Sequence, residues 1–441
     1  MDNAIYNAIS KSVRVGEQAR LEAFQKRWEV YYGQGNKPLK PGNDGYDDSV
    51  RQNFARMFID KGVAFLFGKD LGFELTEGKK TPEEEYLDAF WQANHKMSTL
   101  QKLAVNGAVC GTAFVKLQWN PAMEHPRLIV VDPETVTVTL AEDDLDNVIA
   151  YAIQYPSTDE KGEPIGVRQL IEREGSFWKI TDQRGDVRGG TWYTVGEQRW
   201  PYDFSPMLHC QNMVSPNEFW GMSDIEDDII EVIDKSNFVV ASTLKTLRFH
   251  AYPKTFITGA TSSEDLDFGA DKTLLLPIGA DYKTLEMQSD LAASVTMYRE
   301  LKQFVHELAR IPEVATGKVE SIGQLSGVAL EILYQPLIEK TEAKRITYGE
   351  MIVEINRRVL ALAGFGAEHL TALRWQELLP KDPMTQANAA LQLKQLGVSV
   401  DTLLQKLGHD PDAERKKREK ETNLGKSIMD AFDRGGIDPE E

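Results

Sequence analysis

Cysteine is almost absent from this 441-residue sequence, which contains only Cys110 and Cys210. Two cysteines so far apart predict neither a disulfide framework nor a cysteine-ligated metal site. Disulfides are rare in reducing compartments, so this composition fits an intracellular setting best.

Long apolar runs are absent as well. No run approaches the roughly 18 residues that a membrane-spanning helix requires, and the first residues, MDNAIYNAISKSVRVGEQ, lack the apolar centre of a secretory signal. We therefore expect no association with a membrane. With 41% hydrophobic and 27% charged residues, the composition is that of a folded protein, and the length predicts about two to four domains.

Basic residues are outnumbered by acidic ones. The chain has 50 Lys and Arg against 68 Asp and Glu, for a net charge of −18 at pH 7. Tight binding to nucleic acid over a broad surface needs clustered Lys and Arg that neutralise phosphates, so this balance argues against it. Two interpretations of the acidity stay open: ordinary solubility, or a surface past which DNA slides without sticking.

Catalytic motifs are missing from the sequence. Gly317-Lys318 is the nearest approach to a phosphate-binding loop, but it lacks the upstream glycine and the following Ser or Thr. The histidines are dispersed, none lies in an HExxH motif, and there is no GxSxG. His209 and Cys210 are neighbours in a predicted strand and so face opposite ways, while His306 is expected at a surface or interface. We expect no enzyme, no cofactor and no metal.

One acidic cluster has two interpretations. Asp224, Glu226, Asp227 and Asp228 have the carboxylates that a two-metal nuclease needs. They also lie where a helix is predicted to begin, and carboxylates in a first turn interact favourably with the helix dipole. The second interpretation is simpler, and we favour it.

The first half of the chain predicts helices followed by strands. Residues 1–105 are mostly helical, and in one helix Tyr86, Phe90, Trp91 and Leu100 make a buried face. From about residue 112 to 215, short segments rich in β-branched and aromatic residues alternate with turn-forming residues. These segments read TAFVKLQW, RLIVVD, TVTVTL, NVIAYAIQY, VRQLIERE, SFWKITDQ and TWYTV. Their connections are too short for crossover helices, which predicts antiparallel pairing. The fold class is α+β, mainly helical.

The second half predicts a helix, a small insert and a returning helix. Ser223 and Glu226 have the spacing of a capping box, which opens a helix over 223–250. A small α/β or β insert occupies 251–288, and a helix returns over 289–315. The loop TGKVESIGQLSG at 316–327 leads into a long helix. Pro336 lies inside that long helix, where a proline removes a hydrogen bond and is expected to kink it. Further helices, two of them joined at Gly397, follow over 381–441.

Five segments, in order along nearly the whole chain, resemble a known family. They are NFARMFID with VAFLFGK from residue 53, GTAFV with VDPETV from 111, WGMSDI from 220, IPE with LSGVAL from 311, and GVSVDTLL from 397. Together they resemble the portal proteins of tailed double-stranded DNA bacteriophages, in their smaller form.

The resemblance implies a ring of about a dozen identical subunits at one capsid vertex. Double-stranded DNA would pass through its channel without sequence specificity. The partners would be the packaging motor (terminase) and the capsid, scaffold and head-completion proteins. The subunit would be part of the virion and assemble in the host cytoplasm. Its parts would be a wing at 1–222, stem helices at 223–250 and 289–315, a clip at 251–288, a tunnel loop at 316–327, a long wing helix with a return segment at 328–380, and a crown at 381–441.

The resemblance also assigns site residues. The loop lining the DNA channel would contain Lys318, Val319, Glu320, Ser321, Ile322, Gln324 and Leu325. Partner proteins would dock on the clip at Lys254, Asp265, Asp267, Asp271 and Lys272. A kink at Pro336 would aim the loop inward, although a plain packing bend is equally allowed.

Two alternatives remain open at this point. One is a DNA-processing enzyme, either a nuclease or a motor ATPase. The other is a different structural ring or connector protein of the virion, which would lack the long helix–loop–helix centre.

Overall fold

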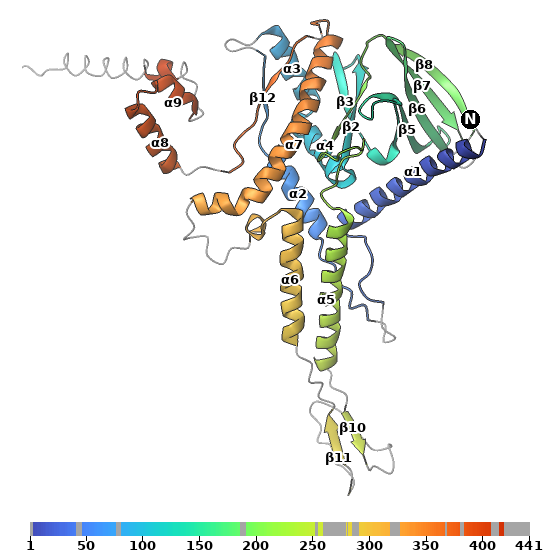
Figure 1. Cartoon of the computed structure of the whole chain (residues 1–441), viewed down its shortest axis with the longest axis vertical. Coiled ribbons are helices and arrows are strands. Elements are labelled where there is room, and N and C mark those ends of the chain that lie inside the picture. The colour runs from blue at the N-terminus through green and yellow to red at the C-terminus, as the bar shows by residue number, and fades with distance from the viewer. Residues whose placement is uncertain are drawn as a thin grey trace, which may run out of the picture. The chain divides into compact units, whose positions relative to one another are not determined.

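The computed structural model describes most of the chain (Figure 1). The described residues are 3–40, 46–75, 81–185, 191–251, 255–258, 279, 281–284, 291–317, 327–366, 368–379, 383–406 and 414–418. The chain forms two compact units. The larger unit comprises Met1–Ile322 with Leu333–Gln376, and the smaller unit comprises Gly323–Ile332 with Glu377–Glu441.

The larger unit begins with helices, as predicted. They are α1 (Asn3–Tyr31), α2 (Phe54–Phe67), α3 (Pro82–Ala93) and α4 (Lys96–Cys110). Thr81 and Glu84 form a reciprocal capping box at the start of α3, and Pro82 occupies its first position. The sequence did not predict strand β1 (Gly72–Glu74), which pairs with the distant β12 (Ala372–Arg374).

The predicted strands form two antiparallel sheets within the larger unit. The first has the order β3-β2-β9, and the second has β4 to β8 in chain order. The first contains β2 (Thr112–Asn120), β3 (His125–Val131) and β9 (Met207–Gln211). The second contains β4 (Val136–Leu140), β5 (Val148–Thr158), β6 (Pro164–Glu174), β7 (Phe177–Gly185) and β8 (Trp192–Trp200). The antiparallel pairing is confirmed throughout.

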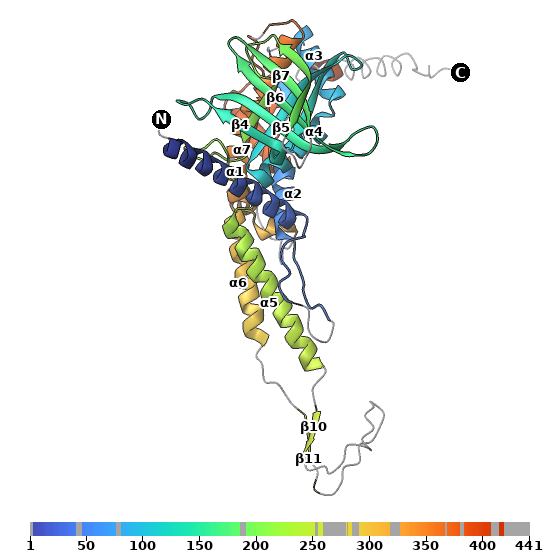
Figure 2. The ribbon, with the colours of Figure 1, turned by 90° about the vertical axis from the view of Figure 1, so that its right-hand side faces the viewer.

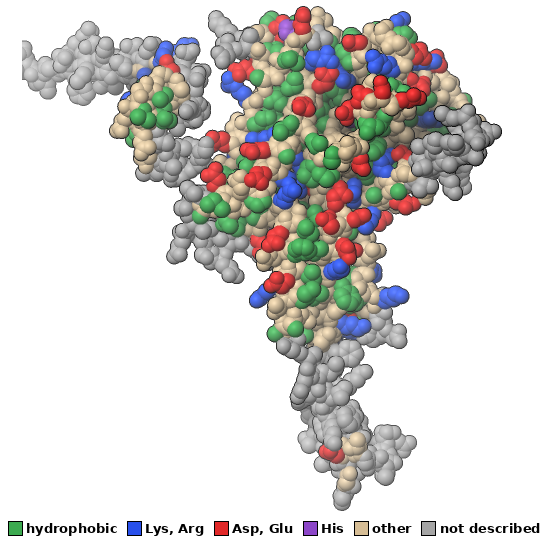
Figure 3. Space-filling view, in the orientation of Figure 1, with side chains coloured by type: hydrophobic (Ala, Val, Ile, Leu, Met, Phe, Trp, Pro, Cys, Tyr) green, Lys and Arg blue, Asp and Glu red, His purple; other side chains and the backbone are tan. Residues whose placement is uncertain are grey.

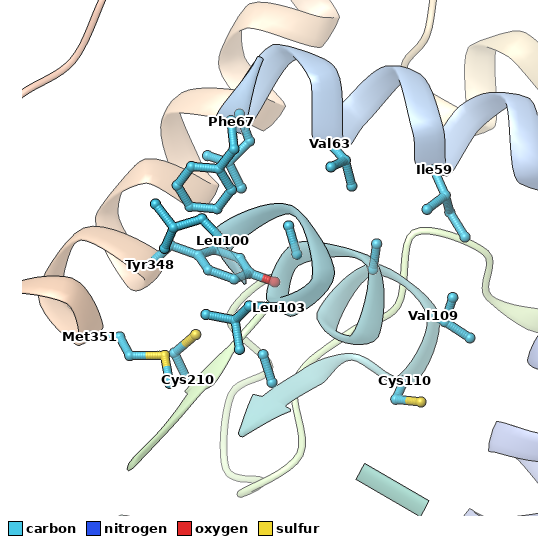
Figure 4. Packing of buried hydrophobic residues seen from close by; sticks show 14 of the residues in the cluster. Ile59, Val63, Phe67, Leu100, Leu103, Val109, Cys110, Cys210, Tyr348 and Met351 are labelled. Atoms are coloured by element: carbon cyan, nitrogen blue, oxygen red, sulfur yellow. The ribbon is translucent and has the colours of Figure 1, made fainter. Parts of the chain in front are cut away.

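Helix α4 lies at the centre of the main core (Figure 4). Its Leu100 and Leu103 are fully buried, and they pack among side chains of α2 and of the long helix α7 (Gly327–Leu362). Phe90, Trp91 and Leu100 are buried as expected, and Tyr86 is half-buried. The expectation of one helix was wrong, because α3 ends at Ala93 and α4, which holds Leu100, begins at Lys96 after a left-handed residue at His95. A second core fills the space between the two sheets. Its members include Phe114, Tyr151, Trp178, Trp200 and Phe204.

Two helices, α5 (Asp227–Ala251) and α6 (Leu291–Ala309), run side by side in both views (Figures 1 and 2). Beyond their ends, β10 (Thr255–Thr258) pairs antiparallel with β11 (Asp281–Thr284), which confirms β structure in the predicted insert. The expectation of one helix over 289–315 was wrong at its end. Arg310 adopts a left-handed conformation, with φ of 56°, and breaks the helix before a short 3₁₀ turn at Glu313–Thr316.

Pro336 lies inside α7, as predicted. The bend expected there stays a prediction. In the smaller unit, α8 (Pro383–Gln395) and α9 (Val400–Lys406) are separated by Gly397, whose φ is 92°. Because glycine adopts this left-handed conformation without a steric penalty, it ends one helix and allows the next to begin. Among the described helices, none has the length and hydropathy needed to cross a membrane.

We expect Gly107→Ala to destabilise the protein by about 1–3 kcal/mol, because the core has no space for the added methyl group. A Cβ at Gly107 would lie 2.0 Å from the Tyr348 hydroxyl oxygen. Gly16→Ala in α1 is the matched control, since nothing lies within 4 Å of its Cβ position. That control should be neutral or stabilising by up to about 1 kcal/mol. Urea denaturation compares the two variants, and equal stabilities would contradict the packing described.

Candidate functional site at the base of the paired helices

A buried ionic cluster lies just before α5. The Asp224 side chain is 1% exposed, and its carboxylate accepts contacts from two ammonium groups of α7. Lys344 Nζ lies 2.6 Å from Oδ2, and Lys340 Nζ lies 3.4 Å from Oδ1. The two lysines are also buried. Asp224, Lys340 and Lys344 are called the junction triad below.

Hydrogen bonds tie the junction triad to three further parts of the core, which are α4, the segment after β9 and the end of α6. The Asp224 N–H donates to the carbonyl of Ala108 in α4 (2.8 Å), and Asn212 Nδ2 donates to Asp224 Oδ1 (3.1 Å). Tyr348 Oη of α7 donates in turn to Asn212 Oδ1 (3.2 Å). Lys340 Nζ donates to the carbonyl of Ala309 at the end of α6 (3.0 Å). The cluster therefore joins both paired helices to α4, to the segment after β9 and to α7.

Burial and charge compete at the junction triad. Burial alone raises the pKa of Asp224, but the ammonium groups of Lys340 and Lys344 outweigh it and lower the pKa to about 2. Burial lowers the pKa of Lys344 to about 8, although the neighbouring Asp224 carboxylate opposes that shift. Asp224 is thus ionised at neutral pH. A fully buried, neutralised carboxylate has no room for a substrate or a hydrated metal, so its role is structural.

The favoured interpretation of the acidic cluster needs correction at Asp224. This carboxylate does not lie in a helical first turn, because α5 begins only at Asp227. The predicted start at Ser223 was wrong, since the chain turns Asp224 toward the lysines of α7 before it becomes helical. One half of the expected capping box is present, with Ser223 N–H donating to Glu226 Oε1 at 2.6 Å. Ser223 Oγ instead accepts from the Ile225 N–H (3.0 Å).

The other three acidic residues behave as expected for a helix start. Asp227 and Asp228 occupy the first turn of α5. Glu226 forms an ion pair with Arg27 of α1, and Asp227 lies 2.8 Å from Lys26 Nζ. Within the part of the chain that the structure describes, no group of His, Cys, Asp or Glu has an arrangement that could hold a metal ion.

One face of the α5–α6 pair is covered and another is exposed. On the covered side, Gln52 N–H donates to Asn237 Oδ1 of α5 (2.8 Å), and Tyr298 Oη of α6 donates to Gln52 Oε1 (2.9 Å). Hydrophobic side chains show on the face turned to the viewer in Figure 3. The exposed large apolar residues of the two helices are Phe238, Leu244, Leu247, Val295, Met297 and Phe304. These exposed residues are together called the stem face below, and they lie on more than one side of each helix, since Val295 and Met297 are only two residues apart in α6. Exposed apolar surface of this kind marks an interaction site.

The predicted site residues fall largely outside the described structure. The tunnel-loop residues Lys318, Val319, Glu320, Ser321, Ile322, Gln324 and Leu325 lie outside it. The clip residues Lys254, Asp265, Asp267, Asp271 and Lys272 also lie outside it. These assignments stay predictions.

Two sequence-based expectations about histidines have different outcomes. His306 is not at a surface, because it is 4% exposed and lies edge-on against Phe54 and Phe58. That expectation was wrong because the apolar face of α6 continues through this position. His209 and Cys210 do face opposite ways, as predicted. His209 contacts Tyr151 Oη (3.1 Å), whereas Cys210 belongs to the main core.

The sequence did not lead us to predict a role for Lys340 and Lys344. A signal was present, because both lysines share a face of α7 with the core residues Leu337 and Tyr348, at spacings of three and four residues. Lysines at core-facing helix positions require a buried counter-ion. Their partner, however, lies far away in the sequence.

Comparison with known proteins agrees with this architecture. Residues 11–426 match the family described as "Phage portal protein, SPP1 Gp6-like". No curated protein matches the sequence. A match over nearly the whole chain defines a phage portal protein, and the resemblance noted in the sequence is confirmed. The chain belongs to the SPP1 Gp6-like family of phage portal proteins.

Three solved structures are similar to the chain at low sequence identity. The first is a chain in the neck of an empty gene transfer agent particle computed with C6 symmetry. It is 15% identical, the match covers 85% of this chain and 93% of that chain, and the TM-score is 0.47. The second is in a native gene transfer agent virion, with 16% identity, 81% and 90% coverage, and a TM-score of 0.44. The third is in a native particle neck computed with C12 symmetry, with 16% identity, 81% and 90% coverage, and a TM-score of 0.43.

We expect Asp224→Ala to destabilise the protein by about 3–5 kcal/mol, because two buried lysines lose their counter-ion. Lys344→Met should cost less, since Lys340 still neutralises Asp224. Asp227→Ala, which breaks an exposed pair with Lys26, is the control and should cost under about 1 kcal/mol. The midpoints of urea unfolding at neutral pH rank the stabilities of the three variants. An Asp224→Ala variant as stable as the Asp227→Ala control would contradict the role assigned to the triad.

Proposed function

We propose that this portal protein assembles into a closed ring of about twelve copies whose central channel passes double-stranded DNA. The observation that carries the proposal is the exposed stem face on a chain of the portal family. Phe238 and Phe304 are 53% and 48% exposed on helices that already have an intramolecular partner in each other. A second copy that covers this surface removes it from water.

A ring imposes a particular kind of contact. Each copy must present two different, complementary surfaces so that the head-to-tail contact closes. The α5–α6 pair supports this arrangement, because apolar residues are exposed on both helices rather than on one. Met297 and Phe304 are seven residues apart and so share one side of α6. We infer that this side packs against α5 of the next copy.

The acidic composition suits a channel for DNA. Under this proposal the net charge of −18 limits phosphate binding, because few cations are available to replace the counterions of DNA. DNA then slides without being held. The composition left two interpretations of the acidity open. Membership of the portal family favours a surface past which DNA slides over ordinary solubility.

We assign the parts of the subunit as follows. Residues 1–222 and 328–380 form the wing, and α5 and α6 form the stem. The clip at 251–288 docks the packaging motor and later the head-completion proteins, and residues 381–441 form the crown. The loop at 316–327 narrows the channel around DNA, where Lys318 is the one cation available to touch a phosphate. These assignments rest on family membership and on the order of elements along the chain.

We expect Phe304→Glu to reduce ring formation, because it places a carboxylate in an apolar contact that would exclude water. Gln154→Glu, on an exposed position of β5, is the control that adds the same charge elsewhere. Native mass spectrometry and negative-stain images should show rings of about twelve chains for the parent and the control, and smaller species for Phe304→Glu. A parent protein that stays monomeric or dimeric would sink the proposed function.

Changes to the tunnel loop should separate assembly from DNA passage. Lengthening 316–327, or replacing Gly323 by alanine to stiffen it, is expected to impair DNA packaging severalfold while ring mass stays unchanged. Packaged DNA per particle and native mass measure the two effects. Normal packaging by such variants would reduce the loop to a mere connection.

A further inference from the structure

A large groove lies between the five-stranded sheet and α7, away from the junction triad. Its volume is about 990 Å³, at the upper end of the range for binding sites in proteins. The β4–β5 turn forms one wall, the segment after β9 forms another, and α7 forms a third. Along α7 the lining residues run from Thr347 to Arg358, which is about 16 Å, or three helical turns.

The groove is strongly acidic. Its carboxylates are Asp143, Asp144, Asp146, Asp203, Glu218, Glu350 and Glu354. Arg358 is the one Lys or Arg among the described lining residues. Its guanidinium is already used internally, since it donates to Glu354 Oε1 (2.6 Å) and to the carbonyls of Ser205 (2.6 Å) and Met207 (2.9 Å).

Three of the groove's carboxylates have no internal counter-ion, whereas Glu354 pairs with Arg357 and Arg358. Within the described part of the chain, Asp143, Asp146 and Glu350 form no ion pair, and all three are exposed. Leu145 and Val214 add apolar surface to the rim, at 51% and 63% exposed. A groove that combines exposed carboxylates with apolar side chains fits a short helix that carries several cations.

The chain itself contains such a segment. Arg415, Lys416, Lys417 and Arg418 form its longest run of consecutive basic residues. The run is helical, and all four side chains are exposed. Arg415 pairs with Asp401 and Lys417 with Glu414, and because these pairs are exposed they are weak and can exchange partners. It belongs to the smaller unit, whereas the groove belongs to the larger one. A closed ring needs two unlike, complementary surfaces on each copy, and an acidic groove with a basic helix is such a pair.

We propose that the groove of one subunit binds the basic segment 415–418 of a neighbouring subunit, as a second inter-subunit contact beside the stem face. This inference rests on the proposed ring. The attraction between opposite charges sets the register of the contact and weakens as salt is added.

Cross-linking between separately labelled copies tests the contact. One chain carries Leu145→Cys and the other Lys416→Cys, and the two are mixed before assembly. Cys110 is fully buried and should not react. Cys210 lines the groove, so both chains also carry Cys210→Ala. A short bis-maleimide is expected to give a product of twice the chain mass, and Glu160→Cys in place of Leu145→Cys should give none. Glu160 is exposed on the turn between β5 and β6.

Charge reversal then tests the chemistry. Asp143→Lys with Asp146→Lys and Glu350→Lys should reduce the product about tenfold, since three weak ion pairs are lost. Lys417→Glu with Arg418→Glu in the other chain should restore it. Rings without the cross-linked product would overturn this inference and leave the proposed function standing. A further variant carries both cysteines on one chain. If it forms the cross-link within that chain while the mixed chains form none, the inference is also overturned. Absence of rings by native mass spectrometry would instead refute the proposed function.

Discussion

The structure depends on one buried ionic contact, that of Asp224 with Lys340 and Lys344. Removing three charges from water is costly, and the cost is offset only where geometry and hydrogen bonds are good. Here the carboxylate accepts from Lys344 at 2.6 Å and from Asn212 at 3.1 Å, while Lys340 also reaches the end of α6. Because all partners must be in place together, the cluster specifies how the paired helices leave the core.

This contact fixes the base of the α5–α6 pair, while part of the surface of the two helices stays exposed further along. At the base, α5 and α6 are fixed to α4 and α7 by the triad and by the surrounding apolar core. Further along, the segment around Gln52 holds one side of the pair and leaves the stem face exposed. The proposed ring needs both properties. Its base would hold α5 and α6 at a constant angle, and their exposed surfaces would remain available for neighbouring copies.

Under the proposed function the acidity of the chain has two different consequences. Spread over the whole surface, it limits the binding of phosphates. Concentrated in the groove beside α7, it makes a surface complementary to the basic run at 415–418. The difference is one of geometry, because dispersed charges are screened within about 10 Å, whereas charges facing one another across a groove act together.

Periodicity and turn chemistry were enough to place the main helices, the antiparallel strands and the helix–insert–helix order, because these depend on local preferences and on short-range spacing. The order of five motifs was enough to recognise the family. The sequence did not place the start of α5, the burial of His306, or the partnership of Asp224 with two lysines more than a hundred residues away. Those features were decided by the tertiary structure. The sequence shows that residue 224 is an aspartate, but it does not show whether its carboxylate lies in water or between two buried ammonium groups. Only the packing of α7 against α4 and α6 determines which of the two it is.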